Sequence, residues 1–446
     1  MNVTQQPVRS TQMNGDGGND LSQLKFKLVT LIESSLDQQH IAQGRTPAMT
    51  NLVHERLQSA SRHKNIVIPG HLEKQFFADV VDEVIGFGPI ESLLSDDTVT
   101  EIMVNGATQV YVERSGKVAL TDVRFQDDAH VERIINKIVS PLGRRVDAKS
   151  PLVDARLPDG SRVNAVVAPC AIDGPSITIR KFSKERLTIE DLINYGSLTS
   201  DMADYLEACV RSKLNIIISG GTGSGKTTLL NVLSGYIPDD ERIVTIEDAA
   251  ELKLNQQHVV RLETRHADAA DERDVTIRAL VRNSLRMRPE RIIVGECRGS
   301  EALDMLQAMN TGHDGSLTTV HANTPRDMIS RLETLVLMAG MDIPVEIVRK
   351  QIASAVQLIV QQARMRDGSR KVTHITEVAG MEGPHVVMQD VIKFEEQGED
   401  SNGKVKGEFG PTGMPPYYVN RLKNHGFNLP SKMFMKGRSN GSSSSR

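Results

Sequence analysis

The chain of 446 residues lacks the features that mark secreted, membrane-spanning or metal-binding proteins. Its three cysteines, Cys170, Cys209 and Cys297, lie far apart without the spacing of metal ligands. We expect them to be small buried residues in a reducing compartment. The N-terminus shows no basic segment followed by an apolar one, and no run approaches the roughly 18 apolar residues of a membrane span. We therefore expect a cytoplasmic protein without an integral membrane segment.

Two nucleotide-related signatures are also missing. A P-loop GTPase carries Asn-Lys-x-Asp after its phosphate loop, but the single Asn-Lys pair, Asn136-Lys137, precedes the only glycine-rich loop and lacks the Asp. A transporter-type ATPase carries Leu-Ser-Gly-Gly-Gln, which does not occur here. The net charge of −4 argues against a general nucleic-acid-binding protein, although it does not exclude a local basic groove.

The chain is long enough for two or three domains, and its pattern changes along its length. After about Ser200, buried-type strands alternate with helical patterns, which is typical of a parallel sheet covered by helices on both faces. The strands expected there lie in NIIIS, RIVTIE, HVVRLE, RIIVGE, SLTTVH and VQLIVQ. We expect six segments: a disordered N-terminus at 1–20, a helical segment at 21–84, an α+β domain at 85–182, a linker at 183–200, an α/β domain at 201–380, and a hairpin around Ser401-Asn402-Gly403 with a tail at 381–446.

The segment SGGTGSGKTTLL, at 219–230, lies between a predicted strand and a helix expected to begin near Lys226. It satisfies the phosphate-loop pattern G-x-x-x-x-G-K-[ST], in which glycines let backbone N–H groups converge on an anion at a helix N-terminus. Lys226 can reach the β- and γ-phosphates, and the hydroxyl of Thr227 can complete a Mg²⁺ shell. The predicted contacts to a nucleoside triphosphate are Gly221, Thr222, Gly223, Ser224, Gly225, Lys226, Thr227 and Thr228.

Three later strands end in side chains suited to phosphate chemistry. Glu247-Asp248, Glu296 and His321 follow the apolar runs of their strands, and the carboxyl ends of parallel strands meet at one edge. A water that attacks the γ-phosphate needs an acceptor to orient it, and the metal needs oxygen ligands. Each residue also has a structural alternative, because the acids could cap helix N-termini and the histidine could be a hydrogen-bonded structural residue.

Arginine is the remaining requirement, since charge that builds on the γ-phosphate must be neutralised, often from a neighbouring domain or subunit. Six arginines lie at suitable places, either upstream or beside the RIIVGE strand: Arg156, Arg162, Arg180, Arg286, Arg288 and Arg298.

These motifs resemble the type II/type IV secretion ATPase superfamily. The phosphate loop, TIEDAAEL, RIIVGECRG and TGHDGSLTTVH follow the order of its Walker A, Asp box, Walker B and His box. Three further segments, EVIGFGPIESLLSDDTVTEIMVNG, VDARLPDGSRVNAV and SPLGRRVD, look most like the tight-adherence (Flp) pilus assembly ATPases of the CpaF/TadA type. The resemblance extends from about residue 80 to residue 365.

The resemblance implies an α/β fold with a RecA-like P-loop NTPase core and an N-terminal α+β domain, arranged as a ring hexamer. It implies that hydrolysis of ATP with Mg²⁺ drives inner-membrane pilus platform proteins, in assembly and possibly retraction of a pilus, at the cytoplasmic face of the bacterial inner membrane. Glu296, Glu247 and His321 would be catalytic, and Thr227 and Asp248 would hold the metal. The resemblance also implies an arginine of the upstream domain that faces the nucleotide, which places Arg162 and Arg180 before the other arginines.

Glu296 stands where many NTPases carry an Asp, so the resemblance leaves open which acid contacts Mg²⁺ and which aligns water. A RecA-like ring that translocates nucleic acid is the alternative function, although we expect no nucleic acid as partner. A scaffold that binds ATP without turnover is disfavoured by the complete set of acids.

Overall fold

The computed structural model describes residues 17–36, 45–63, 68, 70–114, 116–182, 186–265, 273–340 and 342–436. The chain divides into two compact units, Met1–Lys184 and Glu185–Arg446. The disorder expected at 1–20 falls mostly outside the described residues, but Gly17 already begins helix α1. The final SNGSSSSR also lies outside them.

Unit 1 begins with three helices that share an apolar core. They are α1 (Gly17–Ser35), α3 (Pro47–His63) and α4 (Gly70–Ile85). Their buried residues recur at helical spacing, as in Leu28, Val29 and Ile32 of α1 and Val80, Val81 and Val84 of α4. Burial of these stripes against one another explains why this segment folds as a bundle.

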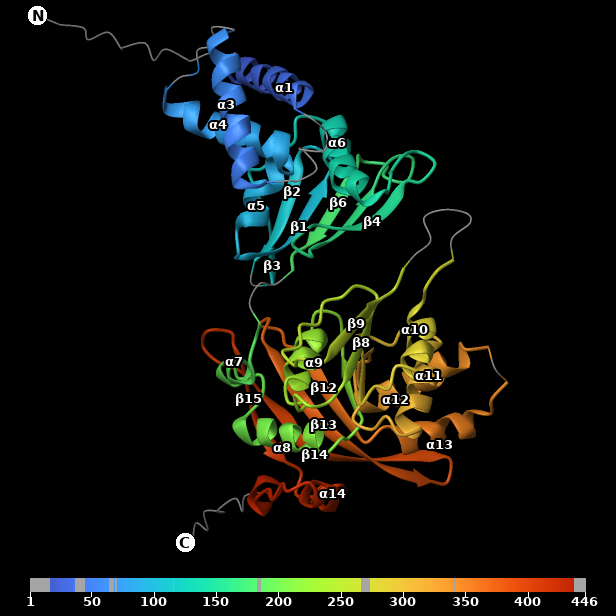
Figure 1. Ribbon diagram of the computed structural model, residues 1–446. Helices are drawn as coiled ribbons and strands as arrows, with labels where there is room; N and C mark the ends of the chain where they lie inside the picture. The colour runs from blue at the N-terminus through green and yellow to red at the C-terminus, as the bar shows by residue number, and fades with distance from the viewer. Residues whose placement is uncertain are drawn as a thin grey trace, which may run out of the picture. The chain divides into compact units, whose positions relative to one another are not determined.

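The rest of unit 1 is a six-stranded antiparallel sheet with helix α6 (Asp128–Val139) on one face (Figure 1). Asp127 caps α6 by accepting a 2.8 Å hydrogen bond from the backbone N–H of His130. The strand order is β3-β2-β1-β6-β5-β4. The strands are β1 (Val99–Asn105), β2 (Gln109–Arg114), β3 (Lys117–Leu120), β4 (Leu152–Arg156), β5 (Arg162–Val166) and β6 (Ser176–Arg180), and two short helices, η1 (Gly88–Ile90) and α5 (Glu91–Ser95), precede them.

Unit 2 is built on a nine-stranded sheet of order β15-β14-β13-β12-β7-β11-β10-β8-β9. All six predicted strands are present and pair in parallel. They are β7 (Ile216–Gly220), β8 (Ile243–Glu247), β9 (Val259–Glu263), β10 (Arg291–Val294), β11 (Leu317–His321) and β12 (Leu358–Arg364). Three antiparallel strands then extend the sheet: β13 (Arg370–Glu382), β14 (His385–Glu399) and β15 (Val405–Pro411), with Ser401, Asn402 and Gly403 in the β14–β15 turn.

Helices cover both faces of the parallel part of the sheet (Figure 1). Successive residues of β7 alternate between two cores: Ile216 and Ile218 lie in one and Ile217 in the other. The first core contains α7 (Ile189–Asn194), α8 (Ser200–Arg211) and α9 (Lys226–Ser234). The second contains α10 (Ile277–Ser284), α11 (Glu301–Asn310), α12 (Pro325–Leu337) and α13 (Val345–Ala355). This is the layered α/β arrangement that the strand and helix alternation predicted.

Three expectations differ from the structure. The linker expected at 183–200 was predicted to hold one short helix and does contain α7, but Leu192 and Leu198 are buried in the core of unit 2, so most of the segment belongs to that unit. The boundary expected at residue 381 falls inside β13, because the antiparallel strands continue the same sheet. Cys209 and Cys297 are buried, but Cys170 is exposed.

The C-terminal segment completes the first core of unit 2 through a buried carboxylate. Glu377 accepts a 2.9 Å hydrogen bond from the hydroxyl of Tyr205, and 2.5 Å and 3.2 Å bonds from the backbone N–H groups of Tyr417 and Tyr418. Burial raises the pKa of Glu377 above its ordinary value, although these three donors favour the charged form. The ring of Tyr205 also packs edge-on against Phe434, at 5.5 Å between ring centroids. Residues after β15 are therefore part of the folded unit, as helix α14 (Val419–Asn424) also indicates.

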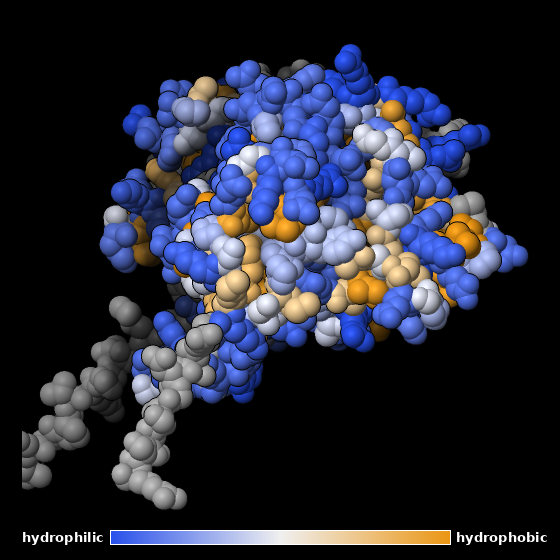
Figure 2. Space-filling view, turned by 90° about the horizontal axis from the view of Figure 1, so that it is seen from below, coloured by the Kyte–Doolittle hydropathy of each residue, from blue (hydrophilic) through white to orange (hydrophobic). Residues whose placement is uncertain are grey.

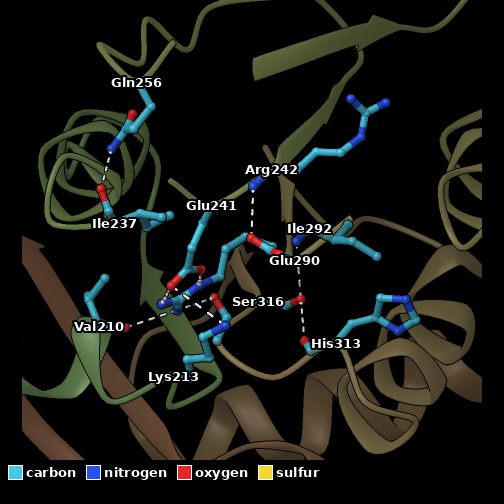
Figure 3. A network of polar contacts seen from close by, with 12 residues as sticks. Val210, Lys213, Ile237, Glu241, Arg242, Gln256, Glu290, Ile292, His313 and Ser316 are labelled. Atoms are coloured by element: carbon cyan, nitrogen blue, oxygen red, sulfur yellow. Dashed lines mark hydrogen bonds and ion pairs between the residues drawn. The ribbon is translucent and has the colours of Figure 1, made fainter. Parts of the chain in front are cut away.

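A buried ion pair joins the starts of three parallel strands, at the end of the sheet where their amino termini lie (Figure 3). The guanidinium of Arg291, fully buried at the start of β10, contacts both carboxylate oxygens of Glu241 at 2.5 Å and 3.2 Å. The same guanidinium donates to the carbonyl groups of Val210 (2.9 Å) and Gly315 (3.1 Å). Gly315 has a φ of +79°, and a Cβ there would collide with the guanidinium. Arg291 thus connects the segments that precede β8 and β11 to the end of α8.

The surface seen from the side of α14 is mostly hydrophilic, with apolar residues in separate small groups (Figure 2). Exposed apolar side chains of the C-terminal segment are Met414, Tyr417 and Met435. Among the described residues, no helix combines the length and hydrophobicity needed to cross a bilayer.

We predict that Arg291→Met lowers the free energy of unfolding of unit 2 by about 3–5 kcal/mol, because Glu241 would stay buried without its main partner. Urea unfolding followed by circular dichroism measures the loss. Arg349→Met is the matched control, since Arg349 forms its ion pair with Glu333 near the surface. A loss no larger than that of the control would contradict the role of the buried pair.

Candidate active site

The phosphate loop joins β7 to α9 and folds around its own lysine. Lys226, the first residue of α9, is buried, and its Nζ donates a 2.9 Å hydrogen bond to the carbonyl of Gly221. The same carbonyl accepts from the hydroxyl of Ser224 at 2.9 Å and from its backbone N–H at 3.4 Å. Donors from three groups therefore converge inside the loop. This concentration of N–H, O–H and ammonium groups at a helix N-terminus suits a phosphate.

Two glycines of the loop have no room for a side chain. Gly225 has a φ of +96°, and an added Cβ would lie 3.1 Å from Cδ of Arg370. A Cβ on Gly220 would collide with the carbonyl oxygen of Gln362. The loop therefore packs directly on strands β12 and β13.

Five charged or polar side chains form a continuous chain of contacts at this loop. Nζ of Lys226 lies 3.5 Å from Nδ1 of His321, and Nε2 of His321 lies 2.9 Å from the Glu296 carboxylate. The other oxygen of Glu296 accepts a 2.7 Å bond from Arg298, whose guanidinium lies 3.5 Å from Asp248. The residues come from α9, the ends of β8 and β11, and the segment after β10, so the sheet edge brings them together as predicted from the parallel strands.

The partners of His321 define its protonation state. Burial lowers its pKa below the ordinary value, Glu296 opposes that shift, and Lys226 and Arg298 add to it. The ring is therefore neutral at pH 7. Because the Lys226 ammonium can only donate, Nδ1 accepts and the single ring proton lies on Nε2, from where it is donated to Glu296.

Glu247 occupies a different position from the other acids. One carboxylate oxygen accepts hydrogen bonds from the backbone N–H groups of Glu251 (2.9 Å) and Leu252 (3.0 Å), and the other is buried without a hydrogen-bond partner. Burial raises its pKa to about 7, although the two N–H donors favour the charged form. A Cβ on Gly295 would lie 2.9 Å from Cγ of Glu247. A glycine directly after β10 therefore leaves room for the Glu247 side chain. Glu247 thus binds backbone N–H groups, but strand β9 and not a helix follows it, so this is not the helix-capping role that was its structural alternative; its other carboxylate oxygen stays buried and unpartnered.

Glu296 does not have the capping role considered for it. The backbone N–H groups of Arg298 and Gly299 are bound instead by Glu301, at 2.6 Å and 2.7 Å. The carboxylate of Glu296 contacts His321 and Arg298 and is available at the edge of the sheet.

The residues present fit a nucleoside triphosphate with Mg²⁺. The loop has donors suited to phosphates, and Thr227 at the first turn of α9, Asp248 and the unpartnered oxygen of Glu247 are hard oxygen groups that would suit Mg²⁺. His321 also lines a pocket of about 280 Å³ with Asn323, Asp327 and Arg331 among its walls.

The upstream arginines belong to unit 1. Arg156, Arg162 and Arg180 are register neighbours across β4, β5 and β6. Register neighbours project from the same face of a sheet, so the three form one row, in which Arg162 and Arg180 are exposed. Arg298, which sequence reasoning placed behind Arg162 and Arg180, contacts Asp248 and Glu296.

Sequence reasoning missed the arginines of the β12–β13 turn. Nε of Arg370 donates a 3.1 Å hydrogen bond to the carbonyl of Gly223 in the phosphate loop, and Arg364 also lies close to Gly223. The basic composition of RMRDGSRK, directly after a predicted strand of the same sheet, is the signal that points to this turn.

Comparison with known proteins places the chain in a family. Residues 83–401 match the family described as Type II/IV secretion system protein. A putative conjugal transfer protein of Mycobacterium tuberculosis is 38% identical over 307 residues, which cover 68% of this chain and 87% of that protein. The type IV secretion system protein VirB11 of Brucella suis biovar 1 is 33% identical over 318 residues, covering 65% and 88% of the two chains. The crystal structure of the VirB11 ATPase of Brucella suis, in complex with sulphate, shows 32% identity, covers 64% of this chain and 91% of that chain, and has a TM-score of 0.36.

We predict that Glu296→Gln separates binding from chemistry. The affinity for ATP should stay within a few-fold, because the loop donors are untouched, whereas kcat should fall on the order of 10²–10⁴, the range for a lost general base. Phosphate release and binding of a fluorescent ATP analogue measure the two quantities. Lys226→Ala is the contrasting variant, which should lose binding as well as turnover. Equal losses of affinity and rate in Glu296→Gln would assign this residue to the Mg²⁺ shell and move the base to Glu247.

Proposed function

Because this chain is an ATPase of the type II/IV secretion system protein family, we propose that it is the motor that powers assembly of a tight-adherence (Flp) pilus. In this role it works as a hexamer at the cytoplasmic face of the inner membrane, on the platform proteins of the pilus. The segments between residues 80 and 182 that resemble this branch support the assignment. The observation that carries the motor function is the chain of contacts Lys226–His321–Glu296–Arg298–Asp248 beside the phosphate loop.

In the proposed reaction, Glu296 accepts a hydrogen bond from the water that attacks the γ-phosphorus and receives its proton as the bond to the bridging oxygen breaks. His321 donates a hydrogen bond from its Nε2–H group to Glu296 and so orients the carboxylate, while Lys226 binds the phosphate oxygens. Phosphate would replace the Gly221 carbonyl as the partner of Lys226. Because Lys226 also contacts His321, which contacts Glu296, the presence of the γ-phosphate would then affect the position of the base.

Thr227 and Asp248 are the residues we assign to Mg²⁺, with the unpartnered oxygen of Glu247 as a further candidate. The ion would neutralise charge on the β- and γ-phosphates. Arg298 lies between Asp248 and Glu296 and keeps the two carboxylates from repelling each other.

The row Arg156–Arg162–Arg180 supports a ring in which each site is completed by a second rigid body. Hydrolysis performs mechanical work only when it alters a contact between bodies that move relative to each other. The two-unit organisation provides such bodies, and a head-to-tail interface that closes gives a finite oligomer, which we propose to have six subunits.

We predict that mass measurement with ATP and Mg²⁺ finds a closed ring, and that Arg180→Ala assembles normally but hydrolyses ATP at least about tenfold more slowly, as expected for a lost phosphate-neutralising arginine. Native mass spectrometry and phosphate release give the two readouts. A monomeric wild-type protein with full turnover would contradict the ring, whereas unaltered turnover of Arg180→Ala would exclude only this arginine.

We also predict which partner accelerates hydrolysis. Phosphate release should rise several-fold with vesicles that contain the pilus platform proteins and remain unchanged with DNA. Salt-dependent DNA binding with DNA-stimulated hydrolysis would favour the nucleic-acid motor instead. Empty vesicles of the same lipids are the control.

A further inference from the structure

The β12–β13 turn, residues 364–370, contacts the phosphate loop at one end and the β14–β15 hairpin at the other. At the loop end, Nε of Arg370 donates to the carbonyl of Gly223, and a Cβ added to Gly225 would lie 3.1 Å from Cδ of Arg370. Arg370 is the first residue of β13 and pairs in register with Arg364, the last residue of β12. The loop is therefore held from outside by a residue of the antiparallel part of the sheet.

The turn itself is tightly bonded. The N–H of Met365 donates a 2.7 Å hydrogen bond to the carbonyl of Ser369, and the N–H of Gly368 donates a 3.0 Å hydrogen bond to the carbonyl of Met365. Asp367 accepts from the hydroxyl (2.6 Å) and the N–H (2.9 Å) of Ser369, and the hydroxyl in particular lowers the pKa of Asp367 to about 2. A turn with these internal bonds moves as one piece.

At its other end the turn is attached to the hairpin by two side chains. The second carboxylate oxygen of Asp367 accepts a 2.9 Å bond from the N–H of Val405, which begins β15. Arg366 contacts Glu396, and its guanidinium lies 3.3 Å from Glu399, both on β14. A movement of the turn therefore displaces the hairpin, and a displaced hairpin pulls on the turn.

Phosphate binding must rearrange the loop where Arg370 holds it. The Gly221 carbonyl accepts from Lys226 and Ser224, which are the donors that a phosphate needs. In a trans peptide the carbonyl of Gly223 and the N–H of Ser224 point in opposite directions, so the hydrogen bond from Arg370 also sets the direction of that N–H. Arg370 is in this sense a positioning residue for the loop.

We propose that the β12–β13 turn couples the conformation of the phosphate loop to the position of the β14–β15 hairpin, so that the position of the hairpin sets the affinity for ATP. The proposal rests on ATP as the substrate of this site. A partner that binds the hairpin and displaces it would thereby change the affinity for the nucleotide without contacting the nucleotide.

A double-mutant cycle on ATP affinity tests this coupling. Arg370→Ala should raise Kd for a fluorescent ATP analogue by about tenfold, and Arg366→Glu, which repels Glu396 and Glu399, by about threefold. In the Arg370→Ala background, Arg366→Glu should have no further effect, because the connection is already broken. Arg349→Ala, which removes an ion pair of α13, is the matched control and should leave Kd unchanged. Additive effects of the two variants would overturn the proposal.

Two further measurements test the coupling even if one of the single variants fails to fold. Arg366→Glu combined with Glu396→Arg should restore the wild-type Kd, and failure of this rescue would contradict the attachment. Hydrogen exchange at the Val405 amide should change when the analogue binds to the wild-type protein, but not to Arg370→Ala. A wild-type protein that binds no analogue would disprove the proposed substrate, whereas normal binding with unaffected variants would disprove the coupling alone.

Discussion

The buried pair of Arg291 and Glu241 is the constraint on which the active site depends. It joins the segments that start β8, β10 and β11, and these strands are only four or five residues long. Fixing where short strands begin also fixes where they end, so the side chains beyond their carboxyl ends meet at one place. The contact between His321 and Glu296 is thus set from the opposite edge of the sheet, by residues that never touch a phosphate.

The charged residues of the site alternate in sign along the sequence of contacts. Lys226 and Arg298 flank the neutral His321 and the carboxylate of Glu296, and Asp248 follows. Each carboxylate therefore has a cationic neighbour before any nucleotide charge enters. Glu247 is the exception, since two N–H donors only partly offset its burial, and its raised pKa records that imbalance. A perturbed carboxylate of this kind is typical of functional sites.

The site could be predicted wherever the chemistry depends on local sequence. The phosphate loop requires glycines before a lysine within eight residues, and the alternation of strands and helices placed Glu296 and His321 at one edge. Arg370 could not be predicted in the same way, because its contact with Gly223 spans 147 positions and involves only a backbone carbonyl. The position of Glu247 behind Gly295 likewise depends on how closely two strands approach, which no periodicity in the sequence records.

The order of the chain has a consequence for how unit 2 is completed during synthesis. Two residues of this core, Tyr205 and Glu377, contact residues that follow β15, namely Tyr417, Tyr418 and Phe434. A nascent chain that has reached residue 411 contains every strand of the sheet and the whole phosphate loop, yet Glu377 still lacks its two backbone N–H donors and Tyr205 still lacks the ring of Phe434. This part of the core is therefore completed late in the synthesis of the chain, after the sheet and the phosphate loop have been made.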